Sequence, residues 1–152
     1  MIFIDKKEEL PLDIPDSLIE KTVIIAIEQQ GAVLANLDLT IVLTDDQQLK
    51  DLNNEWMGID APTDVLSFPS DEIDPDTGNR YLGDIVISIQ RAKLQADTAG
   101  HPVESEVQLL TAHGILHLFG HDHAEAEEKT RMWAAQADIL GRLGLGGMEI
   151  RE

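Results

Sequence analysis

All five histidines of the 152-residue chain lie between positions 101 and 123, and four of them lie within eleven residues. His113 and His117 are four residues apart, a spacing that puts two imidazoles on one face of a helix. Gly120 allows the chain to turn back, so that His123 can supply a third ligand. Three protein nitrogens leave a fourth tetrahedral position for water, as in catalytic zinc sites. The spacing therefore predicts a catalytic metal site, of zinc or another metal that accepts imidazole.

The residues around these histidines refine the hypothesis. Asp122 lies in the turn and is expected to accept the second ring N–H of a ligand imidazole. The spacing also matches the H-E-x-x-H-x-x-G-x-x-H pattern of metzincin peptidases, but Gly114 stands where that pattern has its general-base glutamate. A metzincin-like hydrolase is therefore the weaker interpretation.

Two further segments, 62–69 and 82–88, have the pattern of paired strands, each with an acidic residue at its entry. Those residues are Asp64 and Asp84, although each could equally be an ordinary turn or strand-start residue. Ser67 and Ser88 fall on the same strands. Their hydroxyls could line a cleft, or they could simply bond to the backbone.

The rest of the pattern predicts the elements that must position these groups. Ser17 with Glu20, and Thr44 with Gln47, are spaced as capping boxes that begin helices. Strands and helices do not alternate regularly, which favours an α+β fold over a doubly wound sheet, in a single domain over 1–152. Strands are expected at 36–44, 65–68 and 84–88, and helices at 17–30, 44–56, 89–99, 103–119 and 125–143.

Composition limits the possible classes of protein. Hydrophobic residues make up 43% of the chain, which excludes a disordered acidic tail. The absence of cysteine excludes a disulfide scaffold and a thiolate zinc site. The formal net charge of −18 argues against a general nucleic-acid coat protein. No segment has the pattern of a signal peptide or a membrane span, so we expect a cytoplasmic protein without membrane contact.

The segments 113–123, 63–69 (Thr-Asp-Val-Leu-Ser-Phe-Pro) and 82–85 (Leu-Gly-Asp-Ile) together resemble the YbeY family of bacterial endoribonucleases, which act in rRNA maturation and ribosome quality control. The resemblance implies an α+β fold in which a small mixed sheet of about four strands packs with about five helices. It also implies one zinc ion on the three histidines, cleavage of single-stranded RNA, processing of the 3′ end of small-subunit rRNA, and the ribosome or its proteins as partners.

One segment departs from the family pattern. Met57 holds the position of an arginine associated with activity, and Ile59 that of a lysine. Either other cations hold the RNA or the activity is reduced. With a charge of −18, affinity has to come from a local site or from a ribosomal partner, unless the acidity reflects a salty cytoplasm that screens it. The candidate substrate-binding residues are Ser67, Ser88, Arg80 and Arg91.

The hypothesis is metal-assisted cleavage of a phosphodiester bond, because bound zinc lowers the pKa of water towards about 7. An attacking 2′-hydroxyl would need a base, and the candidates are Asp64, Asp84 and His121. A ribosome-associated binding factor with a structural metal is the alternative of a different class. Trp56 and Trp133 are expected to be core or rim anchors rather than surfaces on which bases stack.

Overall fold

The computed structural model describes residues 1–148. Its centre is a mixed sheet of four strands in the order β1-β2-β4-β3. Strands β1 and β4 both pair with β2 and run parallel to it. Strand β3 pairs with β4 and runs antiparallel to it. The mixed sheet confirms the predicted α+β class. The strands are β1 (Ile2–Lys6), β2 (Leu37–Thr44), β3 (Val65–Pro69) and β4 (Arg80–Ser88).

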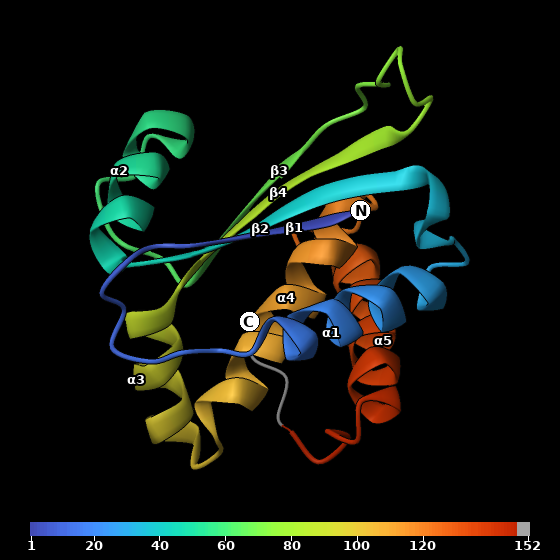
Figure 1. Ribbon diagram of the computed structural model, residues 1–152. Coiled ribbons are helices and arrows are strands. Elements are labelled where there is room, and N and C mark those ends of the chain that lie inside the picture. The colour runs from blue at the N-terminus through green and yellow to red at the C-terminus, as the bar shows by residue number, and fades with distance from the viewer. Residues whose placement is uncertain (149–152) are drawn as a thin grey trace.

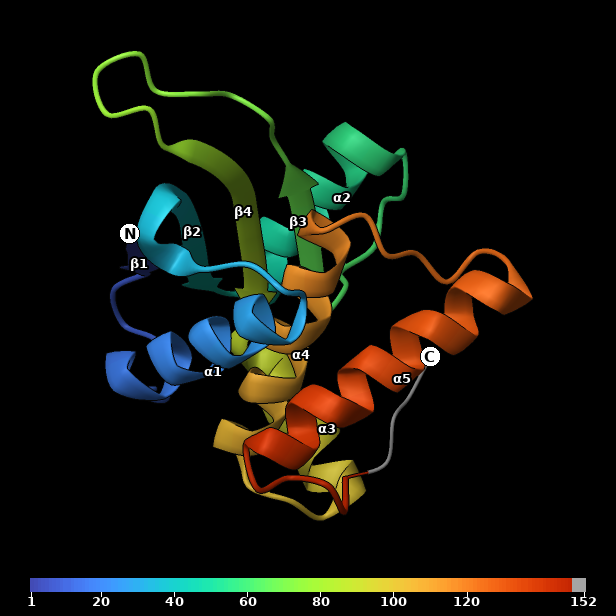
Figure 2. The same cartoon turned by 90° about the vertical axis from the view of Figure 1, so that its right-hand side faces the viewer.

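Five α-helices surround the sheet in the described part of the chain. Helices α1, α4 and α5 lie on one face of the sheet, and α2 lies on the other (Figures 1 and 2). A short 3₁₀ turn at Leu34–Asn36 leads into β2. The helices are α1 (Asp16–Gln29), α2 (Asp46–Met57), α3 (Ile89–Ala99), α4 (Val103–Leu118) and α5 (Ala126–Arg142).

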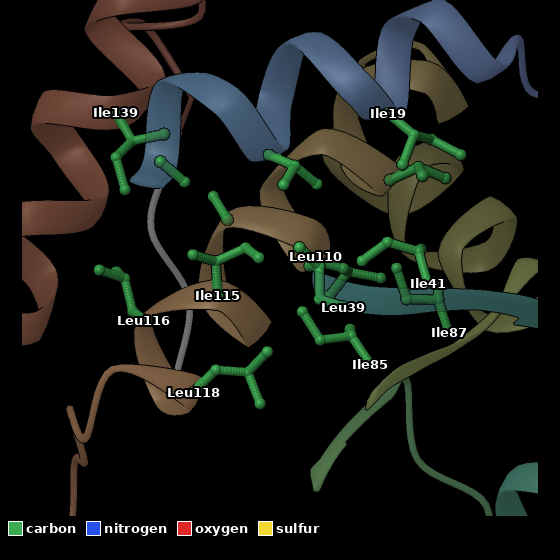
Figure 3. Close-up of a cluster of buried hydrophobic side chains, with 14 of the residues drawn as sticks. Ile19, Leu39, Ile41, Ile85, Ile87, Leu110, Ile115, Leu116, Leu118 and Ile139 are labelled. Atoms are coloured by element: carbon green, nitrogen blue, oxygen red, sulfur yellow. The ribbon is translucent and has the colours of Figure 1, made fainter. Parts of the chain in front are cut away.

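The alternation of side chains along β4 divides the apolar interior between the two faces. Ile85 and Ile87 are fully buried in the larger core, together with residues of α1, α4 and α5 (Figure 3). Val86 points to the other face, where it joins a small cluster with Leu49 of α2 and Leu66 of β3. β4 is therefore packed on both sides, which explains its nearly continuous apolar sequence.

Helix α4 packs unusually close to β4 at Gly114. A Cβ atom at this position would lie 2.7 Å from Cγ2 of the fully buried Ile85. Gly114 is therefore the residue that lets the helix rest directly on the strand. The same contact is a physical argument against the metzincin-like interpretation, since a glutamate here would project into the core and not toward a metal.

The two predicted capping boxes were wrong. Helix α1 begins after Pro15 with no side-chain cap, so Ser17 lies inside the helix. Helix α2 is capped by Asp45, whose carboxylate accepts the Gln48 backbone N–H at 2.9 Å. Thr44 cannot be the cap because its backbone is still paired with β4.

The strand β1 was not predicted from the sequence. It has only five residues, and partly buried and exposed side chains alternate along it. Its position at the sheet edge comes from parallel pairing with β2, which is distant in sequence. Among residues 1–148, none of the helices combines the length and the hydropathy that a bilayer crossing requires.

The Gly114 contact yields a stability prediction with an internal control. Gly114→Ala should lower the free energy of unfolding by about 1–3 kcal/mol, the usual effect of overpacking a filled core. Gly141→Ala, in α5, should be neutral or stabilising by up to about 1 kcal/mol, because no atom lies within 4 Å of its added Cβ and alanine favours helix. Urea unfolding of both variants measures the difference. Equal effects would contradict the close approach.

Candidate metal centre

Three imidazoles converge where α4 ends. His113 and His117 project from the last two turns of the helix, and His123 follows a turn in which Gly120 has a φ of 93°. One ring nitrogen from each of the three lies within 4.8 Å of the other two. The structure therefore brings together the three residues that the sequence predicts as metal ligands.

The hydrogen bonds of the two helical histidines orient their rings. Nδ1 of His113 donates to the Gln136 side-chain oxygen at 2.9 Å, and the ring of His117 is hydrogen-bonded to the backbone of His121. With these nitrogens engaged, the two Nε2 atoms face each other at 3.1 Å. When both rings carry their proton on Nδ1, the two Nε2 lone pairs face each other, an arrangement that a cation between them would stabilise.

This arrangement fits a metal ion. Two nitrogens bound to tetrahedral zinc at about 2.0–2.1 Å lie about 3.3 Å apart, close to the observed separation of the Nε2 atoms. Hydrogen bonds that hold the second nitrogen of a ligand imidazole are typical of metal centres. His113, His117 and His123 can therefore hold one metal ion, with room for a further ligand on the side of the cleft.

Burial also favours the neutral, metal-binding form of these rings. It lowers the pKa of His113, and it lowers that of His117 to about 4, with the neighbouring His113 and His123 adding to the effect. The Gln136 hydrogen bond and the charge of Asp64 act in the opposite direction on His113. Both helical imidazoles are therefore uncharged at neutral pH and available as ligands.

Helix α5 supplies two residues that sequence reasoning missed. Gln136 is almost completely buried. Trp133 contacts His113 edge to face with ring centroids 5.9 Å apart, and its ring is tilted against that of His123 at 5.8 Å. The available signal was a lone amide on the apolar face of the last helix, next to the buried Ala135 and Ile139.

Asp122 has a different role from the one expected. Its carboxylate accepts the backbone N–H of His123, while Gln136 is the partner of His113.

The histidines lie in an open cleft of about 1120 Å³. One wall is α4, another is α3, and the start of β3 forms a third side. Of the residues proposed from the sequence, the cleft contains the following in addition to the three ligands: Asp64, Ser67, Arg91, His121 and Asp122.

Asp64 is held by neutral donors. Its Oδ1 accepts the Val65 backbone N–H at 2.8 Å, and its Oδ2 accepts the side-chain N–H of Gln95 at 3.2 Å. Its charge acts on the pKa of His113, which places the carboxylate near the ligands. Ser67 donates to the carbonyl of Gly114 at 3.5 Å, so its hydroxyl is part of the contact between β3 and α4.

Arg91 and His121 have partners in the fold. Arg91 makes an ion pair with Asp46 at 3.0 Å. The ring of His121 is bonded through Nε2 to the side-chain oxygen of Gln30 at 2.9 Å, and burial together with the charge of Arg131 lowers its pKa. Both line the cleft, but each is already tied to another element.

Three predicted residues lie outside the cleft. Asp84 accepts from the Tyr81 hydroxyl on the face of the sheet opposite α4, because the next residue, Ile85, is the one that meets Gly114. Ser88 is fully buried, and it caps α3 by accepting the Arg91 backbone N–H at 3.1 Å. Arg80 is at the far end of β4, in an ion pair with Asp71. The structure therefore does not bring these three to the metal site.

Comparison with known proteins gives consistent matches. A family profile described as Endoribonuclease YbeY matches residues 3–144. A protein named Endoribonuclease YbeY from Clavibacter michiganensis is 43% identical over 142 residues, covering 90% of this chain and 92% of that protein. One of the same name from Heliobacterium modesticaldum is 39% identical over 137 residues, covering 84% and 82%.

A solved structure is similar in fold. The solution structure of TM1509 from Thermotoga maritima has a TM-score of 0.55 to this chain and 24% identity, and covers 95% of this chain and 92% of that one. At this identity the likeness concerns the fold alone.

The role of Gln136 can be tested against a second buried glutamine. Gln136→Ala should weaken binding of an added divalent metal ion by about 10–100-fold, the usual effect of removing the partner of a ligand imidazole. Gln108 is also buried on α4 but donates to Thr22 at 3.1 Å, away from the cleft. Gln108→Ala should lower the melting temperature and leave the affinity for the metal ion unchanged. Titration against a competing chelator measures both, and equal loss of affinity would refute the specific role.

Proposed function

The chain belongs to the endoribonuclease YbeY family, and we propose that it is a zinc-dependent enzyme that cleaves single-stranded RNA. We place its activity in the cytoplasm, in maturation of the 3′ end of small-subunit rRNA and in ribosome quality control, with the ribosome or its proteins as partners. The observation that carries the zinc assignment is the pair of facing Nε2 atoms at 3.1 Å, with His123 beside them.

In this proposal His113, His117 and His123 hold the zinc ion. Zinc bound there supplies a Lewis acid for a phosphoryl oxygen and lowers the pKa of bound water. Gln136 keeps the proton on Nδ1 of His113, which leaves Nε2 free as a ligand. The burial of both helical rings keeps them uncharged, so they do not repel the ion.

We assign the general base to Asp64. It lines the same cleft as the histidines, and its two oxygens accept from Val65 and Gln95, which fix its orientation without neutralising it. The side-chain amide of Gln95 cannot take the proton, so Asp64 is free to accept one from an attacking hydroxyl or water. Asp84 lies on the opposite face of the sheet, and His121 is bonded to Gln30, so both are weaker candidates.

The main competing function is a ribosome-associated factor with a structural metal. Met57 favours this possibility, because it lines the cleft at the position where the family resemblance leads us to expect an arginine. In that case the metal would support stability, and partner nucleases would cut the RNA.

The metal assignment is tested with two histidines of the same turn. His123→Ala removes a ligand on an exposed segment and should abolish stoichiometric zinc and reduce RNA cleavage at least about 100-fold, since each ligand is needed for the ion to act. His121→Ala should keep one zinc per chain, because His121 is bonded to Gln30. Elemental analysis and cleavage of a single-stranded rRNA fragment give the two readouts.

The same measurements separate the competing functions. Full cleavage by zinc-free His123→Ala would refute the catalytic metal. No cleavage of bare RNA by zinc-loaded wild type, with a sharp fall in melting temperature for His123→Ala, would favour the binding factor. Turnover of casein that a chelator abolishes would favour a peptidase.

Asp64 and Asp84 form a matched pair for the base. Asp64→Asn keeps the acceptor for the Val65 N–H but cannot take a proton, so cleavage should fall by about 10²–10⁴-fold. Asp84→Asn should retain cleavage within about threefold, because Asp84 lies on the other face of the sheet. Single-turnover cleavage rates at saturating zinc test this, and an equal loss in both variants would contradict the assignment.

A further inference from the structure

Trp56 is far more exposed than its helical pattern predicts. It lies in the last turn of α2, and 63% of its surface is accessible, in contrast to the core or rim position expected for a helical tryptophan. An exposed aromatic ring indicates a contact surface when other exposed apolar side chains lie beside it.

The ring of Trp56 is nevertheless held in place. Phe68 of β3 contacts it edge to face, with centroids 6.0 Å apart and planes at 66°. Helix α2 ends at once after it, with Gly58 at a φ of 71° and its N–H bonded to the carbonyl of Asn54. Figure 2 shows α2 beside β3 at this end of the sheet. The ring is therefore a preorganised surface, since little side-chain freedom is lost when a flat group binds to it.

Trp56 and Phe68 do not line the metal cleft, but the residue that follows Trp56 does. Met57 is 51% exposed and lines the cleft, and so does Leu94 of α3, which is 56% exposed. The cleft therefore carries exposed apolar side chains from α2 and α3, and Trp56 is next to one of them in the last turn of α2.

The charges of the cleft favour one kind of occupant. Asp64, Glu106 and Asp122 line it. Among the described residues, Arg91 is the only lysine or arginine of its lining, and it is paired with Asp46. Attraction to the phosphates of a strand is therefore limited to Arg91 and a bound metal ion. Affinity must come from uncharged contacts, and the faces of unpaired bases provide them, because every base can stack on an aromatic ring.

We propose that Trp56 and Met57 form a stacking platform for a base of the single-stranded RNA that enters the metal cleft. The proposal rests on the proposed function and adds the binding site for the strand outside the reacting phosphate. It also gives a physical cause for strand selectivity, because the base faces of a duplex are covered by their neighbours. Bases hold the strand here, and phosphates contribute little.

The test measures binding by zinc-loaded full-length protein. The probes are fluorescein-labelled 12-mers: oligouridine, oligodeoxythymidine, and an abasic strand that keeps the phosphates and lacks bases. Trp56→Ala should weaken binding of both base-bearing strands about tenfold, within the range found for loss of one stacking ring. Trp56→Phe should restore most of the affinity. Phe3→Ala, which removes a 46% exposed ring at the opposite edge of the sheet, should have no effect.

Two further readouts separate stacking from charge. The abasic strand should bind wild type at least about tenfold more weakly than oligodeoxythymidine, since it has no base to stack. The slope of log affinity against log salt for oligodeoxythymidine should be about −1.4 or shallower, because each neutralised phosphate of a single strand contributes about −0.7 and the described lining of the cleft offers only Arg91 beside the added metal ion. Melting curves of all variants verify that the exposed substitutions leave the fold intact.

Several results would overturn the platform. These are equal binding by Trp56→Ala and wild type, equal binding of abasic and base-bearing strands, or no binding of any strand. Normal strand binding by Trp56→Ala with lost co-sedimentation with small ribosomal subunits would identify the occupant as a protein, which also overturns it. Cleavage assays on the same samples keep the two proposals apart. If binding depends on Trp56 but the RNA is not cleaved, the stacking platform is supported and the endonuclease is refuted. If the RNA is cleaved but binding does not depend on Trp56, the endonuclease is supported and the platform is refuted.

Discussion

The contact of α4 with β4 at Gly114 is the constraint on which the site depends. Because the helix rests on Ile85, and α1 and α5 pack beside it, α4 is buried over most of its surface. Only a stripe that ends in His113 and His117 opens to the cleft. The same burial removes water from these imidazoles and keeps them uncharged. The same packing that forms the core therefore also keeps the two imidazoles uncharged and able to bind a metal ion.

Local spacing predicted that the three histidines would come together, because His113, His117 and His123 are neighbours along a helix and its terminal turn. It also predicted most helices and three strands. What it missed depends on contacts between distant segments. Gln136 meets His113 only after α5 docks, and β1 exists only as a partner of β2. Asp64 and Asp84 look equivalent in sequence, but Asp64 lies just before β3 and lines the cleft, whereas Asp84 lies within β4 and is bonded to Tyr81 outside it.

The negative charge of the chain limits how its cleft can bind RNA. A charge of −18 leaves few cations for RNA, and the described lining of the cleft contributes only Arg91, itself paired with Asp46. Two positive charges from a metal ion would balance much of the carboxylate charge from Asp64, Glu106 and Asp122. The protein would then select its substrate by chemistry at one phosphate and by apolar contact with bases, with little long-range steering.

The hydrogen bond from His113 to Gln136 has a consequence for biosynthesis. All three ligands precede residue 124, whereas their supporting amide lies on the last helix and leaves the ribosome later. A nascent chain can therefore expose the histidine cluster before its tautomers are fixed, and tight loading has to await the docking of α5. Since a ligand stabilises the state that binds it best, an ion held by the three histidines would in turn stabilise the docking of α5 against α4. Metal binding and the docking of α5 would then be coupled.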